Sequence, residues 1–121
     1  MDKYTMPTHE TIDTLIIAVI SSQDFFSVKN DLIFHQYFFT HISSTGGFLQ
    51  SSSDLLLIGI NYKQLEHLNG LLYDHCKKRI TNIATQSQIE THFQPTQPII
   101  IEAETGGATL LTFSVERFEQ F

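Results

Sequence analysis

The sequence is poor in cysteine and in cations, and it has no long apolar run. The one cysteine, Cys76, excludes an internal disulfide and fits a reducing compartment. Seven Lys and Arg stand against 13 Asp and Glu, a net charge of −6, which argues against partners such as DNA, RNA or an anionic membrane, since these need a cationic surface. No stretch approaches the roughly 18 apolar residues of a membrane helix, and the start of the chain lacks the apolar core of a secretory signal. We therefore expect a soluble cytoplasmic protein.

What the sequence does contain is enough apolar material for one packed domain. Hydrophobic residues make up 41% of the 121 residues, ten of them phenylalanine. A chain of this length can bury a single core. We expect residues 13–121 to form that domain, and the polar segment 1–12 to be a flexible N-terminal extension.

Hydrophobic periodicity predicts an alternation of strands and helices. Apolar, β-branched runs predict strands at 13–22, 37–43, 54–60, 98–104 and 108–115. Helical spacing predicts a helix over 23–35, with Ser21 and Asp24 as its capping box, and a second helix after Asn61 and Gln64. The interval 80–97 is polar and is expected to be a long irregular loop, and Gly106-Gly107 a hairpin turn.

This order predicts an α+β domain of the ferredoxin-like βαββαβ class. Its sheet edges must be covered or paired, and oligomerisation is a common solution.

The histidines and the cysteine do not predict a metal site or an enzyme. His67 and His75 lie on the second predicted helix but eight residues apart, too far along its axis to share a metal. Cys76 belongs to the apolar stripe of that helix, which favours burial over a nucleophilic role. No Ser, His or Asp stands in a recognised catalytic motif, so we expect no catalytic residue.

The segment SSTGGFLQ at 43–50 has two interpretations. Gly46 and Gly47 are typical of an ordinary turn. Alternatively, they let backbone N–H groups approach a ligand while Phe48 stacks on a base. Nearby aromatic residues, Phe34 and 37–39, are likewise either core and subunit interface or a stacking platform.

Several motifs resemble the PII-like cyclic di-AMP receptor family. They are TGGFL at 45–49, Gly59 near the end of a strand, CKKR at 76–79 and GGATLLTFSVERFEQF at 106–121. The resemblance runs from about residue 14 to residue 121. It implies a homotrimer of ferredoxin-like subunits, related in fold to nitrogen-regulatory PII proteins and without catalytic activity. It also implies that cyclic di-AMP binds between subunits, and that the loops around Gly46-Gly47 and at 80–97 reorganise when it binds. A downstream protein partner is expected, and the resemblance does not say which.

The resemblance also implies a set of ligand-binding residues. Thr40 would bond adenine, Gly59 would offer its backbone, and Gln120 would approach from the C-terminal segment. Gln36 and Ser53 stand where the family carries asparagine. The remaining implied residues belong to the glycine loop and are Gly46, Gly47, Phe48 and Leu49.

The sequence departs from the family pattern at two further positions. Phe38 stands where an arginine is expected, and Leu111 where a phenylalanine is expected. Between Lys29 and Lys63 the chain has no Lys or Arg. Cyclic di-AMP carries two negative charges, and burying them requires cations or several aligned donors.

Three hypotheses follow from the missing arginine. Cations at 77–79 of a neighbouring subunit compensate, or backbone N–H groups around Gly46-Gly47 suffice. Otherwise, the protein is a diverged member that has lost cyclic di-AMP binding and acts through protein–protein contacts of the loop 80–97.

Overall fold

The computed structural model describes residues 12–43, 52–85 and 99–121, without the side chains of 83–85 and 99. Its strands are β1 (Thr14–Ser21), β2 (Phe38–Ile42), β3 (Ser53–Ile60), β4 (Arg79–Thr85), β5 (Ile99–Thr105) and β6 (Ala108–Ser114). Its helices are α1 (Phe25–Phe34) and α2 (Leu65–Cys76), each preceded by a short 3₁₀ turn, η2 (Ser22–Asp24) and η4 (Tyr62–Gln64). The predictions for segment 1–11 and for the glycine loop lie outside the described residues.

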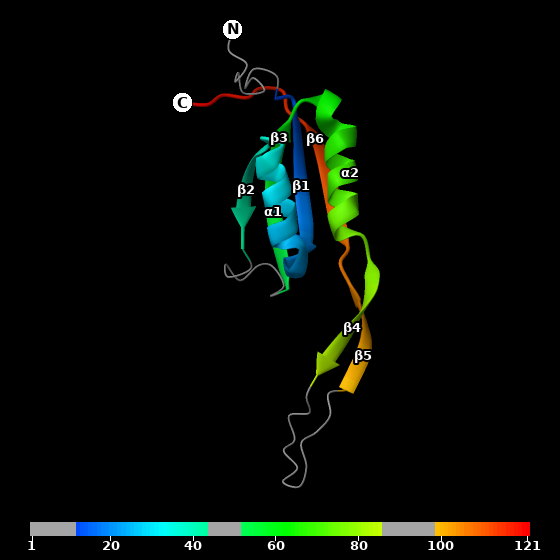
Figure 1. Cartoon of the computed structure of the whole chain (residues 1–121). Coiled ribbons are helices and arrows are strands. Elements are labelled where there is room, and N and C mark those ends of the chain that lie inside the picture. Colours follow the sequence, from blue (N-terminus) through cyan, green and yellow to red (C-terminus); the bar gives the residue numbers. More distant parts are fainter. Residues whose placement is uncertain (1–11, 44–51, 86–98) are drawn as a thin grey trace.

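Four strands form an antiparallel sheet in the order β2-β3-β1-β6, and both helices lie on one of its faces (Figure 1). Helix α1 connects β1 to β2, and β3 lies between these two strands in the sheet. Helix α2 lies on the connection from β3 to β6, and β1 lies between those two strands. Two interleaved split βαβ units of this kind are what the ferredoxin-like prediction requires. The observed architecture agrees with that α+β prediction.

The core lies between the sheet and the helices because β1 and β3 alternate strictly. Every second residue of each strand is buried against the helices, and the residues between are half-buried on the other face. The buried strand residues are Ile16, Ala18, Ile20, Leu56, Ile58 and Ile60. They pack against Val28 and Leu32 of α1 and against Leu68, Leu72 and Cys76 of α2.

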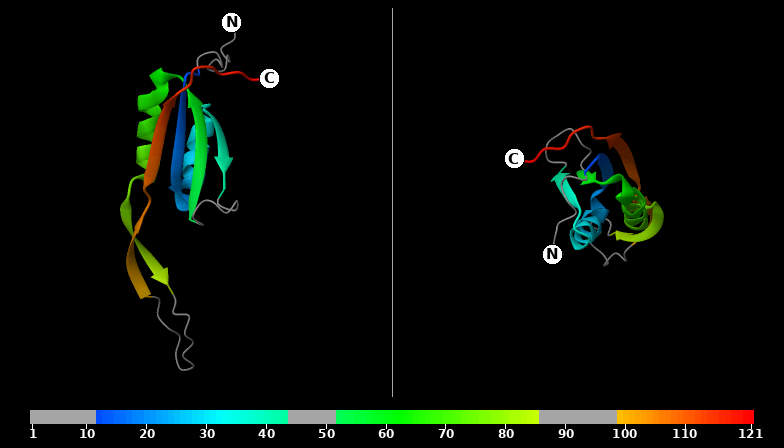
Figure 2. Two further views of the ribbon diagram at one scale, coloured as in Figure 1. Left: turned by 180° about the vertical axis from the view of Figure 1, so that it is seen from behind. Right: turned by 90° about the horizontal axis from the view of Figure 1, so that it is seen from above.

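The other face of the sheet, which we call the open face, carries neither of the described helices (Figure 2). The register pairs Leu15 with Phe113 and Ile17 with Leu111, which places these side chains on the same side. Phe113 and Leu111 are 47% and 48% exposed. Among the described residues, a hydrophobic surface on this face is therefore left uncovered.

The predicted hairpin at 98–115 is wrong. β5 pairs with β4 to form a separate two-stranded arm, whereas β6 pairs with β1 as the edge of the main sheet. Gly106 and Gly107 have φ of +90° and +99° and carry the chain from one sheet to the other. The first part of the predicted loop 80–97 is therefore strand, because residues 80–85 belong to β4.

The arm extends away from the body, beyond the end of α2 (Figure 1). Residues 86–98 lie outside the described residues.

One predicted capping box is confirmed and the other is wrong. Asn61 Oδ1 accepts a hydrogen bond from the Lys63 N–H at 2.9 Å, and Gln64 Oε1 accepts one from the Asn61 N–H at 2.9 Å. Ser21 makes no side-chain capping bond. The Asp24 carboxylate, expected to complete its box, is instead buried against Arg79.

We predict that Gly70→Ala stabilises the protein. Gly70 lies inside α2, and an added Cβ would meet no atom within 4 Å. Alanine removes the entropic cost of an interior helical glycine, so the free energy of unfolding should rise by about 0.5–1 kcal/mol. Urea unfolding followed by circular dichroism measures this change, and a lower midpoint for the variant would contradict it.

Candidate functional site

A cavity of about 480 Å³ opens at one end of the sheet, where β1, β2 and β3 meet the C-terminal segment. Its volume lies in the range of small-molecule sites, roughly 300–1,000 Å³. Its lining residues are Ile12, Thr14, Leu15, Phe38, Phe39, Thr40, Leu57, Gly59, Val115, Phe118 and Gln120. We call it the tail cavity because three of these residues belong to the segment after β6.

The tail cavity brings together three residues that the sequence assigns to ligand binding. Thr40 lies opposite Leu57 in the β2–β3 pair, and Gly59 lies opposite Phe38. Gln120 reaches the same cavity from the C-terminal segment. An added Cβ at Gly59 would meet the Ile12 side chain at 3.4 Å, so glycine allows close packing at this wall.

Two other predicted residues lie elsewhere. Gln36 is in the left-handed region, with φ of +62°, just before β2, and it does not line the tail cavity. Ser53 starts β3, opposite Ser21, at the far end of that strand from Gly59. The predictions for Gly46, Gly47, Phe48 and Leu49 fall outside the described residues.

Ser53 lines a second cavity, of about 550 Å³, at the junction of body and arm. This junction cavity is also lined by Lys78, Glu104 and the backbone of Gly106-Gly107. Lys78 thus gives the junction cavity a cation among its lining residues, whereas the described lining of the tail cavity has none.

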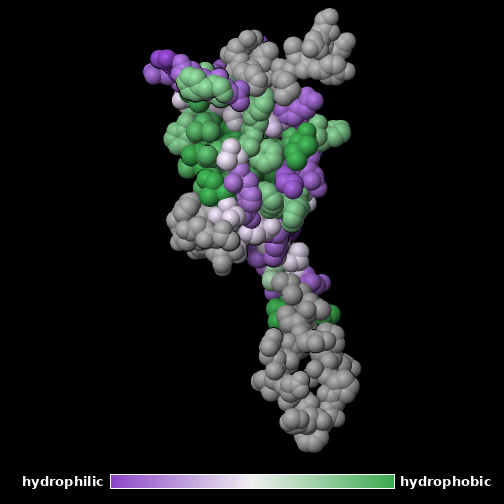
Figure 3. Space-filling model, turned by 90° about the vertical axis from the view of Figure 1, so that its left-hand side faces the viewer, coloured by the Kyte–Doolittle hydropathy of each residue, from purple (hydrophilic) through white to green (hydrophobic). Residues whose placement is uncertain are grey.

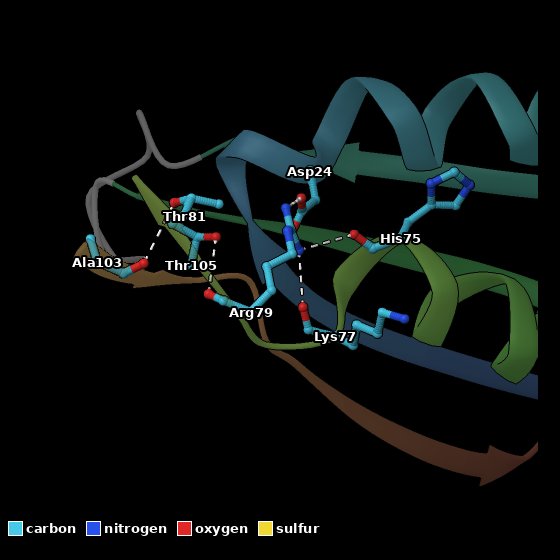
Figure 4. A network of polar contacts seen from close by, with 7 residues as sticks. All are labelled: Asp24, His75, Lys77, Arg79, Thr81, Ala103 and Thr105. Atoms are coloured by element: carbon cyan, nitrogen blue, oxygen red, sulfur yellow. Dashed lines mark hydrogen bonds and ion pairs between the residues drawn. The ribbon is translucent and has the colours of Figure 1, made fainter. Parts of the chain in front are cut away.

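Arg79 is already engaged within its own chain (Figure 4). Its guanidinium donates to Asp24 Oδ1 at 2.5 Å and to the Lys77 carbonyl at 2.9 Å. Asp24 is 4% exposed, and the hydrogen bond to it raises the pKa of Arg79. Arg79 therefore anchors the arm to the start of α1 and is a poor candidate for binding the ligand of a neighbouring subunit.

The lining of the tail cavity suits a flat base better than a phosphate. None of its described lining residues is charged, and three of them, Phe38, Phe39 and Phe118, are aromatic. The side chains of Thr40 and Gln120 supply hydrogen-bonding groups at the same wall. Aromatic rings stack on any nucleobase, and the polar groups then orient it.

Sequence reasoning missed Val115 and Phe118 as cavity residues. Neither lies on a periodic element, because the segment after β6 is irregular. The available signal was their position within five residues of Gln120 in the sequence.

The histidines of the described residues have polar partners. Tyr37 Oη lies 2.5 Å from His67 Nδ1, and His75 Nε2 lies 2.8 Å from Asp31 Oδ2. In the ranges that the structure describes, no three His, Cys, Asp or Glu side chains form a group suited to a metal ion.

Cys76 is expected to be unreactive in the native protein. Its side chain is 1% exposed, and burial, with the nearby Asp24 carboxylate, raises its pKa to about 11. At pH 8 the thiol therefore stays protonated, and the nucleophilic thiolate is scarce. We predict that a disulfide reagent modifies Cys76 at least about a hundredfold more slowly in native than in urea-unfolded protein. Equal rates in the two states would contradict this.

No helix in the described parts of the chain is long and apolar enough to cross a membrane.

Comparisons with known proteins cover nearly all of the chain. A sequence model for the cyclic-di-AMP receptor family matches residues 13–121. Among solved structures, a functionally unknown protein from Pediococcus pentosaceus ATCC 25745 is 27% identical in sequence. The match covers 92% of this chain and 99% of that one, with a TM-score of 0.69. The similarity therefore includes both the sheet and the segment that lines the tail cavity.

Proposed function

Because the chain belongs to the cyclic-di-AMP receptor family, which is PII-like, we propose that it is a non-enzymatic signal-transduction protein that binds cyclic di-AMP between the subunits of a homotrimer. Family membership points to a binding and signalling role rather than to catalysis. We place this activity in the cytoplasm, as the sequence predicts.

The observation that carries the proposal is the tail cavity. It gathers Thr40, Gly59 and Gln120, three residues expected to contact the ligand, although Thr40 and Gln120 lie far apart in the sequence. Aromatic walls and neutral hydrogen-bonding groups there match the chemistry of adenine.

The distribution of the expected residues supports a ligand shared between subunits. Gly59 and Ser53 lie at opposite ends of β3, six positions apart in the register. At about 3.4 Å per residue this separation is roughly 20 Å, longer than one small ligand spans. A single cyclic di-AMP that contacts both positions takes them from two chains.

The open face supports self-association. Half-buried leucine, isoleucine and valine side chains of β1 and β3 cover it, together with the exposed Leu111 and Phe113 of β6. Hydrophobic residues gather along the left margin of the body in Figure 3. An uncovered apolar sheet face of this kind is typical of a protein–protein interface.

A second candidate function keeps the scaffold and loses the ligand. The described lining of the tail cavity has no cation, and the arm exposes three isoleucines: Ile80 and Ile100, each 68% exposed, and Ile101, 48% exposed. These observations favour a diverged member that acts through protein–protein contacts of its long loop, 80–97, which leads from β4 to β5 in the arm.

Calorimetric titration with cyclic di-AMP distinguishes the two candidates, with ATP and cyclic di-GMP as controls. We expect binding at micromolar affinity or better. Thr40→Val should weaken it about tenfold by removing one hydrogen bond, whereas Thr112→Val, on exposed β6 outside the cavity, should leave it unchanged.

Two outcomes would contradict the proposal. No heat and no thermal shift at saturating cyclic di-AMP would reject ligand binding and leave the protein-contact candidate. A monomer in light scattering, with and without ligand, would reject the site between subunits.

A further inference from the structure

We propose that Arg117 binds a phosphate of the ligand and so supplies the positive charge that Phe38 does not. This inference rests on the proposed function, because it names a residue of the same site. It assigns to the C-terminal segment an electrostatic role in addition to that of Gln120.

The position of Arg117 follows from its neighbours. Val115 and Phe118 both line the tail cavity, and Gln120 does so a little further along. Arg117 lies between these residues in the sequence and is not itself a lining residue, so it stands next to the mouth of the cavity rather than in its wall. Its side chain is 79% exposed, which leaves the guanidinium accessible to a ligand that enters from solvent.

Other described cations are placed less well. Lys29 lies over the Phe26 ring on α1, and Lys77 lies over the Tyr73 ring on α2. Lys78 lines the junction cavity, and Arg79 pairs with Asp24.

Of the cations in the described ranges, Lys63 is the one left, and it provides the matched control. It belongs to η4, none of whose residues lines the tail cavity. A substitution at Lys63 therefore changes the net charge as one at Arg117 does, without touching the cavity segment.

The present partner of Arg117 is easily exchanged. Its Nε and Nη2 donate to one oxygen, Glu119 Oε2, at 3.0 and 2.6 Å. Both side chains are largely exposed, and ion pairs between exposed neighbours contribute little to stability. A phosphate offers two oxygens to the planar fork of the guanidinium and is the better bidentate partner.

Glu119 then acts as an internal competitor for the guanidinium. When the ligand is absent, the carboxylate holds Arg117; when the ligand binds, its phosphate replaces the carboxylate. Removal of the Glu119 charge should therefore strengthen binding, while removal of the Arg117 charge should weaken it.

Four proteins test this inference by calorimetric titration with cyclic di-AMP at low and high salt. Relative to wild type, Arg117→Gln should bind about tenfold or more weakly and should lose part of its salt dependence. Glu119→Gln should bind several-fold more tightly, and Lys63→Gln should stay within about twofold of wild type. Thermal unfolding should show that all four are equally folded.

Each other outcome has a distinct meaning. If wild type binds and Arg117→Gln binds equally well with the same salt dependence, Arg117 does not contact phosphate. If Lys63→Gln weakens binding as much as Arg117→Gln, the effect belongs to net charge and the inference is wrong. If wild type itself does not bind, the proposed function fails, and this inference fails with it.

Discussion

Replacing Phe38 with arginine is expected to tighten cyclic di-AMP binding by about tenfold or more. Phe38 lies in the wall of the tail cavity, opposite Gly59 in the strand pairing. A charge-assisted hydrogen bond contributes about 1.5–3 kcal/mol, and each 1.4 kcal/mol is a factor of ten in affinity. The described lining of this cavity has no charged residue, and cyclic di-AMP carries two negative charges. An arginine at position 38 would therefore supply a cation that the ligand can pair with.

The control for this variant is Phe38→Leu. Leucine removes the ring and adds no charge, so a loss of stacking alone should weaken binding. Calorimetry at two salt concentrations separates the two effects, because only Phe38→Arg should make binding more salt-dependent than in wild type. If Phe38→Arg binds no better than wild type, position 38 does not face the phosphates.

Replacing Gly106 with alanine is expected to lower the free energy of unfolding by about 3 kcal/mol. An added Cβ would lie 2.6 Å from the Lys77 carbonyl oxygen and 2.9 Å from that of Cys76. It would also lie 2.6 Å from Arg79 Nη1, so it would disturb the hydrogen bonds that anchor the arm. The φ of +90° adds strain for any residue with a side chain.

Gly107→Ala separates the clash from the backbone strain. Gly107 has a similar φ, +99°, but an added Cβ would meet only the flexible Lys78 side chain, at 3.4 Å. We therefore expect a smaller loss, about 1–2 kcal/mol. Thermal unfolding should show a melting temperature about 10 °C or more lower for Gly106→Ala and a smaller decrease for Gly107→Ala. Equal decreases would mean that the close approach at Gly106 does not matter.

The sequence predicts the body of the fold well because its signals there are local. Continuous apolar runs identify β1 and β3 as strands, and the spacing of Leu65, Leu68, Leu72 and Cys76 identifies the buried face of α2. The Asn61–Gln64 capping box is equally local. These features depend on residues a few positions apart, so they can be predicted from the sequence without a structure.

Prediction from the sequence fails where a strand or a side chain pairs with a partner that is distant in the sequence. Two strands joined by Gly-Gly are typical of a hairpin, yet β6 pairs with β1 and β5 pairs with β4. The Asp24–Arg79 pair joins residues 55 positions apart and competes with the expected cap at Ser21. Nothing in the local pattern indicates either choice.

The candidate site was predictable only in part. Thr40, Gly59 and Gln120 come from a family resemblance, and the tail cavity brings them together. Val115, Phe118 and Arg117 lie on an irregular segment, where periodicity has no meaning. Ser53 does not line this cavity because the register places it at the far end of β3, and Gln36 does not because it lies in the connection before β2.

The anchor between Arg79 and Asp24 has a consequence for the order of folding. Asp24 ends the turn before α1 and is buried, and its carboxylate gains its cation only when the first residue of β4 arrives. Burying a carboxylate without a cation costs free energy. We therefore expect α1 to pack fully on the sheet only when Arg79, which follows α2, is in place. The base of the arm thus belongs to the same cooperative unit as the core, and the projecting part is an addition to that unit.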